Sequence, residues 1–400
     1  MKTPEIKLNK IIFDSKKKCS NIHPWFFSRA ISNEPKDLKP GSLVKILDSV
    51  GSFVGYGHYN PLSSIRARVI SFKEDEIPNT NFLENKISQA YAQRKNLNIN
   101  SDSFRVVFSE SDGLPGLVID KFYDYAVIQT NTAGMDKMKT ELASIIARVC
   151  EVSGVVERND CEIRKLEGLS VSKGVLFGKE PPNEILINEN GLKFAVSLLN
   201  GQKTGFFLDQ RENRMAVANF AKPGMRILDA FCFSGGFGTY CAERGVSSIH
   251  ILDESEDSLA LAKKNLDLNG FANIDLKSHR GDAFSILRTF RDSRIDFDII
   301  VLDPPKFAPT IKDADKAERG YKDINLLGIK LVRDGGFLAT FSCSSGISRE
   351  RFRQILERAA RDSCRKVAIL ATLGQPADHP ISLSFPESEY LKGYILRIGG

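Results

Sequence analysis

The sequence contains no hydrophobic run long enough to cross a membrane. A spanning helix needs about 18 or more consecutive apolar residues, and no segment of this chain approaches that length. The positively charged residues 1–10 are not followed by the hydrophobic region that a secretion signal requires. These absences predict a cytoplasmic protein with no membrane partner.

Cysteine pairs are also missing. The seven cysteines are spread along the chain, their number is odd, and no two have the C-x-x-C spacing. Zinc sites and disulfide frameworks need such pairs, so we expect neither a metal nor a disulfide. Isolated cysteines are mostly small buried hydrophobic residues, and at most one or two should be reactive. No internal repeat or low-complexity tract is present either.

Positive charge is concentrated near the N-terminus. Residues 1–73 hold 13 Lys and Arg against 5 Asp and Glu, a net charge of +8. The whole chain carries +6, so the other 327 residues sum to −2. A basic module on a near-neutral body favours an anchor for a polyanion. The alternative is an ordinary solvated basic face, and the cluster Lys16, Lys17 and Lys18 is equally consistent with a solvated turn.

Three domains are expected from the changes of pattern along the 400 residues. Residues 1–73 look all-β, with short strands separated by Gly and Pro, which is typical of a small barrel. Residues 74–187 form a mixed α+β central domain. Residues 188–400 predict an α/β fold, a doubly wound, Rossmann-like parallel sheet. The expected strands are 43–47, 52–56, 65–70, 104–108, 116–120, 125–130, 226–231, 248–253, 298–303 and 337–342, and the expected helices are 81–96, 135–149, 255–269 and 314–332.

Four polar residues lie at or just past the ends of strands in the last of these domains. They are Asp229, Asp253, Asp303 and Cys343. In doubly wound sheets, ligands bind beyond the carboxyl ends of the strands. We therefore expect the active site at this edge of the sheet.

The first of these strands leads into a glycine loop, residues 231–238, where the backbone can approach a ligand closely. Asp253 follows Asp229 by 24 residues and is placed to bind ribose hydroxyls. A dinucleotide would fit too, but the loop lacks the G-x-G-x-x-G spacing and Asp229 would repel a pyrophosphate. A sulfonium with an amino-acid tail avoids that repulsion, which favours S-adenosylmethionine as the cofactor. Asp282 would then bind the adenine amine, although a helix N-cap explains its position equally well.

The turn 303–307, with the sequence D-P-P-K-F, follows the fourth strand. Its prolines aim Asp303 and nearby carbonyls outward, which suits holding a planar base by its polar edge. Cys343 ends the fifth strand near a helix expected to begin around Ser348, whose N-terminus would favour a reactive thiolate. The alternative for a lone cysteine is buried filler.

A cysteine at this position suits cytosine chemistry. C5 of cytosine attacks a methyl sulfonium only after a thiolate has added to C6, and protonation at N3, helped by Asp303, would stabilise the adduct. Loss of the C5 proton then expels the cysteine. Without Cys343, the same turn would indicate methylation of an amino group.

Together these motifs resemble the bacterial 23S rRNA 5-methylcytosine methyltransferases that carry an N-terminal PUA domain. The resemblance covers nearly the whole chain, and the ordered set of motifs is more specific than any one of them. The matching segments are 23–26 (H-P-W-F), 55–61 (G-Y-G-H-Y-N-P), 110–117 (E-S-D-G-L-P-G-L), 203–211 (K-T-G-F-F-L-D-Q-R), 303–307, 341–344 (F-S-C-S), 377–380 (A-D-H-P) and 390–393 (Y-L-K-G).

The resemblance implies specific roles. It makes Cys343 the nucleophile, and it places Gln210 with Asp229, Asp253 and Asp282 against the cofactor. The full set of expected cofactor contacts is Gln210, Asp229, Phe231, Ser234, Gly235, Gly236, Phe237, Asp253, Asp282 and Asp303; the expected contacts to the base are Pro304, Pro305, Lys306 and Phe307. For Phe307, core packing is as consistent as stacking on the base.

A related branch of 7-methylguanine rRNA enzymes shares the central domain but lacks a cysteine at the position of Cys343. This chain differs in one respect from other 5-methylcytosine RNA enzymes, many of which carry a second cysteine in the D-P-P loop. Here Lys306 follows Pro305, so the acceptor of the C5 proton is unassigned.

RNA is the expected partner, as 23S rRNA or a large-subunit precursor. The basic barrel would bind phosphates with strong salt dependence, and the target base would have to be unstacked. One rival is methylation of a guanine or adenine nitrogen without a cysteine. The other is an RNA-binding module with a degenerate methyltransferase domain. The oligomeric state stays open, a homodimer included.

Overall fold

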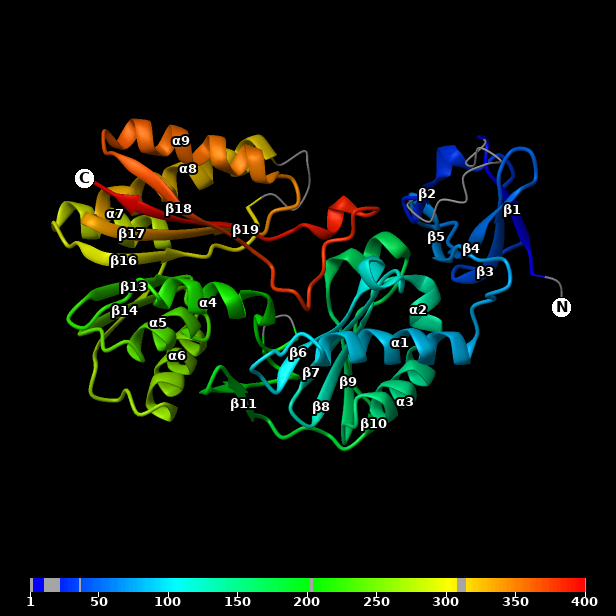
Figure 1. The fold of residues 1–400 in the computed structure, drawn as a ribbon, viewed down its shortest axis with the longest axis horizontal. Helices are drawn as coiled ribbons and strands as arrows, with labels where there is room; N and C mark the ends of the chain where they lie inside the picture. The colour runs from blue at the N-terminus through cyan, green and yellow to red at the C-terminus, as the bar shows by residue number, and fades with distance from the viewer. Residues whose placement is uncertain (1–2, 11–21, 36, 202–203, 308–313, 400) are drawn as a thin grey trace. The chain divides into compact units, whose positions relative to one another are not determined.

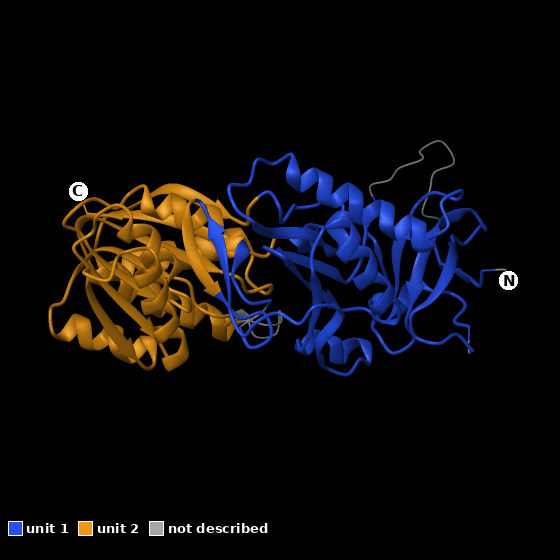
Figure 2. Ribbon diagram, turned by 90° about the horizontal axis from the view of Figure 1, so that it is seen from below, with its two compact units in different colours: residues 1–190, 196–208, 377–388 blue, residues 191–195, 209–376, 389–400 orange. Residues whose placement is uncertain are grey.

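The computed structural model describes residues 3–10, 22–35, 37–201, 204–307 and 314–399. They form two compact units (Figure 2). The first unit comprises residues 1–190, 196–208 and 377–388, and the second comprises 191–195, 209–376 and 389–400. Within the described residues, no helix has both the length and the apolar character needed to cross a membrane.

The first unit begins with a five-stranded sheet in the order β1-β3-β4-β5-β2 (Figure 1). Only β1 and β3 are parallel; the other neighbours are antiparallel. Small β-rich segments separated by Gly and Pro form it, as predicted for residues 1–73. Its buried core includes Val44, Ile46 and Val69. The strands are β1 (Glu5–Lys7), β2 (Trp25–Phe27), β3 (Ser42–Leu47), β4 (Phe53–Tyr59) and β5 (Ile65–Ser71).

A second five-stranded sheet of the first unit has the order β10-β9-β8-β7-β6. Two helices, α1 (Thr80–Lys95) and α3 (Lys139–Val149), contact each other and pack on this sheet. A single helix was expected over 135–149, but Met138 leaves helical geometry at φ −102° and ψ 6° and separates α3 from α2 (Ala133–Lys137). The strands are β6 (Ser103–Phe108), β7 (Leu117–Phe122), β8 (Tyr125–Thr130), β9 (Gly154–Asn159) and β10 (Ser172–Gly178).

Two of the N-terminal motifs join these two sheets. Trp25 Nε1 donates to Glu110 Oε1 at 2.7 Å, and the Arg68 guanidinium lies 2.8 Å from Glu167 Oε1. The Asn60 side-chain amide donates to both the backbone carbonyl and the carboxylate of Glu167. Both glutamates are buried, so these contacts compensate charges that would otherwise be costly to bury. The residues of H-P-W-F and G-Y-G-H-Y-N-P therefore bind protein groups here.

The second unit is built on a seven-stranded sheet in the order β15-β14-β13-β16-β17-β19-β18. All neighbours are parallel except that β19 runs antiparallel to β17 and β18. The strand order reverses on the two sides of β13, which makes the carboxyl ends of β13, β14 and β16 the expected ligand site. The strands are β13 (Arg226–Ala230), β14 (Ser248–Asp253), β15 (Asp275–Arg280), β16 (Phe297–Leu302), β17 (Val332–Ser342), β18 (Val367–Gly374) and β19 (Lys392–Ile398).

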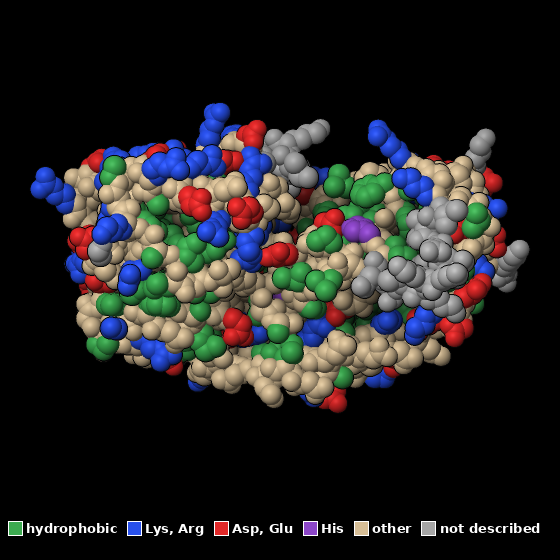
Figure 3. Space-filling view, turned by 45° about the horizontal axis from the view of Figure 1, so that its top comes forward, with side chains coloured by type: hydrophobic (Ala, Val, Ile, Leu, Met, Phe, Trp, Pro, Cys, Tyr) green, Lys and Arg blue, Asp and Glu red, His purple; other side chains and the backbone are tan. Residues whose placement is uncertain are grey.

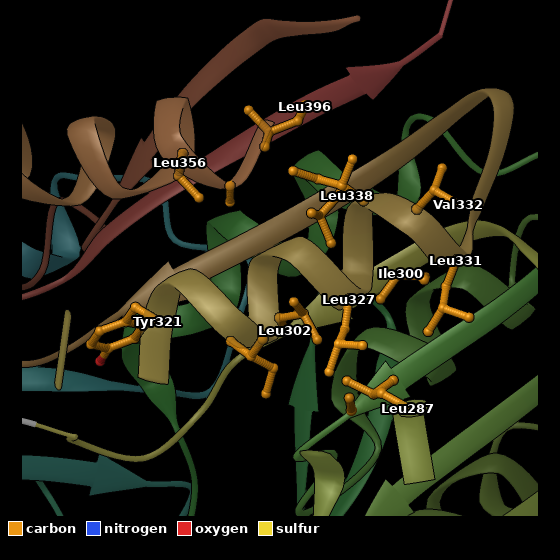
Figure 4. Packing of buried hydrophobic residues seen from close by; sticks show 14 of the residues in the cluster. Leu287, Ile300, Leu302, Tyr321, Leu327, Leu331, Val332, Leu338, Leu356 and Leu396 are labelled. Atoms are coloured by element: carbon orange, nitrogen blue, oxygen red, sulfur yellow. The ribbon is translucent and has the colours of Figure 1, made fainter. Parts of the chain in front are cut away.

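Helices cover both faces of this sheet because alternate strand residues point to opposite sides. Ile227 and Val301 pack into one buried cluster, whereas Leu228 and Leu302 pack into the other. Figure 4 shows the second cluster, with Leu302 close to Leu327. This arrangement confirms the doubly wound prediction. Helices α4 (Arg211–Ala218), α5 (Gly236–Ala242) and α6 (Glu256–Leu268) cover the first face, and α7 (Ala283–Asp292), α8 (Ala314–Leu331) and α9 (Arg349–Ser363) cover the second.

The segment 377–388 lies between β18 and β19 in the sequence but belongs to the first unit. Asp378 is fully buried; its carboxylate accepts the N–H of Arg105 at 3.0 Å and its carbonyl accepts from Arg94. Arg94 also forms two hydrogen bonds with Asp112, at 2.6 and 2.7 Å. The expected boundary at residue 188 did not include such a return to the first unit. The division into three domains stays a prediction.

Candidate active site

The parallel registers bring the four expected strand-end residues to one edge of the sheet. Asp229 of β13 lies opposite Ile251 of β14 and Val301 of β16. Asp253 ends β14, and Asp303 and Cys343 follow β16 and β17 directly. Because these strands are adjacent and parallel, the side chains at their carboxyl ends share one edge.

The loop after β13 has an unusual backbone. Phe231, Phe233 and Gly235 all adopt left-handed conformations, with φ of 61°, 46° and 65°. For phenylalanine this costs on the order of 1–3 kcal/mol, and such strain persists only where the surroundings hold it. The N–H of Cys232 donates to Leu252 O at 3.1 Å, and that of Phe233 to Asp253 Oδ2 at 3.0 Å. The end of β14 therefore fixes the loop.

Asp253 has both a structural contact and spare capacity. Its Oδ2 accepts from Phe233, and its Oδ1 accepts the N–H of Ser255 at 2.9 Å. A carboxylate offers about four lone-pair sites, so one on each oxygen is left for a pair of vicinal hydroxyls. This donor set fits a ribose, and the ribose contact stays a prediction.

Asp229 is 1% exposed and accepts the N–H of Gly238 at 2.9 Å. Burial raises the pKa of this carboxyl to about 7; the Gly238 N–H lowers it, the charges of Asp303 and Asp253 raise it further, and Arg214 lowers it. The negative charges of Asp253 and Asp303, which raise the pKa of Asp229, would also attract a cation. A sulfonium or ammonium group fits this field, whereas a pyrophosphate does not.

Gln210 lies at the end of a short 3-10 helix before α4, where it is 3% exposed. Its Nε2 donates to Asp303 Oδ2 at 2.9 Å, and its Oε1 accepts from Asn213 at 2.6 Å. Asn213 also donates to the carbonyl of Gly374 at 3.0 Å. The expectation for Gln210 was a cofactor contact; the structure shows an amide chain that fixes the orientation of the Asp303 carboxylate.

Asp282 is the N-cap of α7 in this structure. It accepts the backbone N–H of Ser285 at 2.8 Å and its hydroxyl at 2.7 Å, both through Oδ2. The hydroxyl hydrogen bond is the largest influence lowering its pKa. The capping alternative is thus realised, and the adenine contact of Asp282 stays a prediction.

Cys343 lies beside the proline turn. Its Sγ is 4.0 Å from the carbonyl oxygen of Pro304, and the side chain is half-buried. Helix α9 begins at Arg349 with Ser348 as N-cap, as expected, but Cys343 precedes that cap by five residues. Since the influence of a helix terminus is largely confined to its first turn, α9 is a weak source of thiolate stabilisation.

In the rest of the turn, some side chains are packed in the protein and others are exposed. Pro304 is buried, whereas Pro305 and Lys306 are exposed. The Phe307 ring lies 4.7 Å from the ring of Tyr321 and packs against the buried cluster of α7, α8 and α9. Core packing, one of the two alternatives for Phe307, describes these contacts, and base stacking stays a prediction.

Residues that the sequence did not single out complete the site. Asn213 orients Gln210, and Arg214 lies against the loop, where a Cβ on Gly236 would be 2.8 Å from its Cδ. Lys392 is buried beside Cys343, with its Nζ 2.8 Å from the Ser344 carbonyl. A lysine at the start of the strand 392–398, where the only other charged residue is the exposed Arg397, was the available signal.

The N-terminal charge is partly compensated. Of the 13 basic residues of 1–73, Lys2, Lys16, Lys17, Lys18 and Lys36 lie outside the described residues. Four of the described ones form ion pairs with glutamates. Figure 3 shows Lys and Arg interspersed with acidic side chains on the face in view. The four that are exposed and have no ion pair among the described residues are Lys7, Lys10, Arg29 and Lys39.

Comparisons with known proteins agree with this architecture. A PUA-like domain family matches residues 14–72, and an S-adenosylmethionine-dependent methyltransferase family matches residues 171–382. Ribosomal RNA large subunit methyltransferase I of Tolumonas auensis is 41% identical over 96% of this chain and 97% of its own length. The protein of the same name from Shewanella denitrificans is 40% identical over 94% and 95%.

Solved structures show the same fold. A protein described as a SAM-dependent methyltransferase from Streptococcus mutans superposes with a TM-score of 0.81 at 20% identity, over 98% of this chain and 100% of that one. A methyltransferase complexed with SAH superposes with a TM-score of 0.82 at 21% identity, over 99% and 100%. The predicted cofactor and fold are thereby confirmed, and the chain belongs to the S-adenosylmethionine-dependent methyltransferases, with a PUA-like domain at its N-terminus.

Proposed function

We propose that this enzyme forms 5-methylcytosine in large-subunit ribosomal RNA, with Cys343 as the nucleophile. The relatives' names support the RNA class, and the PUA-like domain supports RNA binding. The observation that carries the choice of base is the position of Cys343, whose sulfur lies 4.0 Å from Pro304 O in the D-P-P turn. A half-buried thiol beside that turn can reach a base held there. An rRNA substrate would place the enzyme in the cytoplasm.

The cofactor would bind along the edge formed by the loop 231–238 and Asp253. When bound, it supplies an electrophilic methyl group on a positively charged sulfur. The acidic side chains Asp229, Asp253 and Asp303 provide the negative field for that charge. Loop residues Phe231, Ser234, Gly235, Gly236 and Phe237 would line the amino-acid tail.

Cys343 and Asp303 would act on opposite parts of the cytosine ring. The Cys343 sulfur forms a bond to C6, which moves electron density to C5 and lets C5 take the methyl group. Asp303, oriented by Gln210 at 2.9 Å, hydrogen-bonds the N3 edge and stabilises the protonated adduct. Loss of the C5 proton re-forms the C5–C6 double bond and expels the Cys343 thiolate.

Replacing the cysteine tests this function. Cys343→Ala should abolish methyl transfer to RNA while cofactor binding stays near the wild-type value, because the change removes one sulfur at a strand end. Cys364→Ala is the matched control, since Cys364 is exposed and follows α9. RNA with 5-fluorocytosine at the target should give a covalent adduct with wild type and with the control, but not with Cys343→Ala. Methylation by a folded Cys343→Ala protein, with no adduct in wild type, would instead support modification of a ring or exocyclic nitrogen.

A further inference from the structure

Lys392 is a buried lysine at the end of the strand that flanks Cys343. It is the first residue of β19, is 2% exposed, and pairs in antiparallel register with Ser342 at the end of β17. Its Nζ donates to the carbonyl of Ser344 at 2.8 Å and to that of Tyr390 at 2.9 Å. Lysine is almost never fully buried without a compensating partner, and neither carbonyl carries a charge.

The amine can keep its charge in this buried position. An ammonium group has three N–H donors and no acceptor; two donors are used by the carbonyls, and the third has no partner among the described residues. Burial lowers the pKa of Lys392 to about 8, while Cys343 and Glu389 raise it and Arg349 and Lys306 lower it. At neutral pH the amine therefore still carries a proton in most molecules.

Neither Tyr321 nor Lys306 supplies a comparable charge to Cys343. The Tyr321 hydroxyl is 2.9 Å from Ser344 Oγ and is neutral, since burial raises its pKa to about 12. Lys306 is exposed, so water screens its charge. The terminus of α9 is too far along the chain to act through its first turn.

We propose that Lys392 is the positioning residue that maintains Cys343 as a thiolate, through a buried ammonium fixed on the main chain beside the cysteine. This step rests on the proposed cytosine chemistry. The thiol proton passes to solvent, the ammonium keeps its own protons, and the sulfur electron pair then forms the bond to C6. When the adduct breaks down, the same charge stabilises the departing thiolate.

The geometry favours this electrostatic role over that of a base for the C5 proton. A base needs a free lone pair, whereas this nitrogen, with a pKa of about 8, is protonated in most molecules at neutral pH, and its two hydrogen bonds hold it on the main chain. A substitution that keeps the charge should therefore keep most of the effect. Lys392→Arg preserves a positive charge, whereas Lys392→Met preserves length and removes it.

The test measures thiol reactivity directly. Alkylation of Cys343 by iodoacetamide is followed by peptide mass spectrometry against pH in the full-length protein. Lys392→Met should move the midpoint for Cys343 upward by about one pH unit or more, and Lys392→Arg should stay near wild type. Cys364 in the same sample is the internal reference and should not change. Tyr321→Phe, which removes a contact to Ser344 without changing charge, should also leave the midpoint in place.

The outcomes separate this inference from the proposed function. If the Cys343 midpoint is unchanged in Lys392→Met while wild type still yields 5-methylcytosine, the role of Lys392 is wrong and the function stands. If the midpoint shifts but Cys343→Ala still methylates RNA, the cytosine mechanism fails instead. Where Lys392→Met does not fold, Lys392→Gln carries the same test, because an amide can replace one of the two hydrogen bonds without the charge.

Discussion

At the scale of single residues, the three carboxyl groups of the candidate site differ in how many of their hydrogen-bonding positions are already occupied by the protein. Asp229 is buried and tied to Gly238, Asp303 is held by Gln210, and Asp253 keeps lone pairs on both oxygens. Their mutual repulsion is relieved when a cation binds among them. Cofactor affinity should therefore respond to the protonation of Asp229.

The first prediction concerns pH. Asp229 has a raised pKa of about 7, so its ionised fraction grows as pH rises through that value. A sulfonium binds the ionised form better, so affinity for S-adenosylmethionine should rise between about pH 6 and about pH 8 and then level off. S-adenosylhomocysteine has the same amino-acid tail without the sulfonium charge and should depend less on pH. Calorimetry of both compounds measures this, with Asp229→Asn as the variant that removes the step; a pH step that persists in a folded Asp229→Asn protein would exclude Asp229 as the titrating group.

The second prediction concerns Asp253. Asp253→Ala should weaken cofactor binding by about 1.5–3 kcal/mol, because the change would remove the predicted charge-assisted hydrogen bond to the ribose together with the Phe233 anchor. The control is Asp257→Ala, an exposed acid in the first turn of the helix that follows Asp253. Calorimetry should find normal affinity in the control. Unchanged affinity in a folded Asp253→Ala protein would remove Asp253 from the site.

At the scale of elements, the glycine loop depends on close packing between its backbone and α6. Gly235 has φ +65°, and a Cβ there would lie 2.7 Å from the Ala262 Cβ. Gly224 also has a positive φ, +84°, but nothing lies within 4 Å of its added Cβ. Both positions have a left-handed backbone that strains any residue other than glycine, but only Gly235 also lacks room for a side chain.

This pair gives the third prediction. Gly224→Ala should lower the free energy of unfolding by about 1 kcal/mol, from left-handed strain alone. Gly235→Ala should lower it further and should weaken cofactor binding, because the loop must move away from Ala262. Urea unfolding and calorimetry measure the two effects. Equal destabilisation of both variants would show that the packing on α6 does not constrain the loop.

Strands could be predicted from the sequence, whereas hydrogen bonds between distant side chains could not. Strands such as 226–231 and 298–303 were predicted within one or two residues, because apolar runs bounded by turn residues are local signals. The amide chain from Asn213 through Gln210 to Asp303 was not, because it depends on side chains that meet only in the fold. The burial of Lys392 was missed for the same reason, although the K in Y-L-K-G was visible.

At the scale of the whole molecule, the chain passes between its two units more often than the sequence suggested. Residues 377–388 leave the methyltransferase sheet and join the first unit through Asp378. The PUA-like sheet is likewise tied to the central sheet by Trp25–Glu110 and Arg68–Glu167. Deleting residues 1–73 would leave two buried glutamates without these partners and would destabilise the remaining protein. A loss of RNA affinity in the deletion could then not be separated from a loss of stability.

The fourth prediction therefore tests the electrostatic anchor by substitution. Changing Lys7, Lys10, Arg29 and Lys39 to Gln removes four exposed charges that have no ion pair among the described residues. RNA affinity should fall, and the slope of log affinity against log salt should become shallower by up to roughly 0.7–0.9 for each RNA phosphate that is no longer neutralised. Cofactor affinity should not change, because the candidate cofactor residues belong to the second unit.

The matched control for that experiment changes Lys45 and Lys73 to Gln. Both already pair with glutamates, Glu74 and Glu76, so their replacement should alter RNA binding and its salt slope much less for each charge removed. Filter binding across a range of salt concentrations compares the variants. If the fourfold variant keeps the wild-type slope while its fold is intact, these four residues of the PUA-like sheet are not the anchor. RNA would then have to be bound by basic side chains outside these four residues.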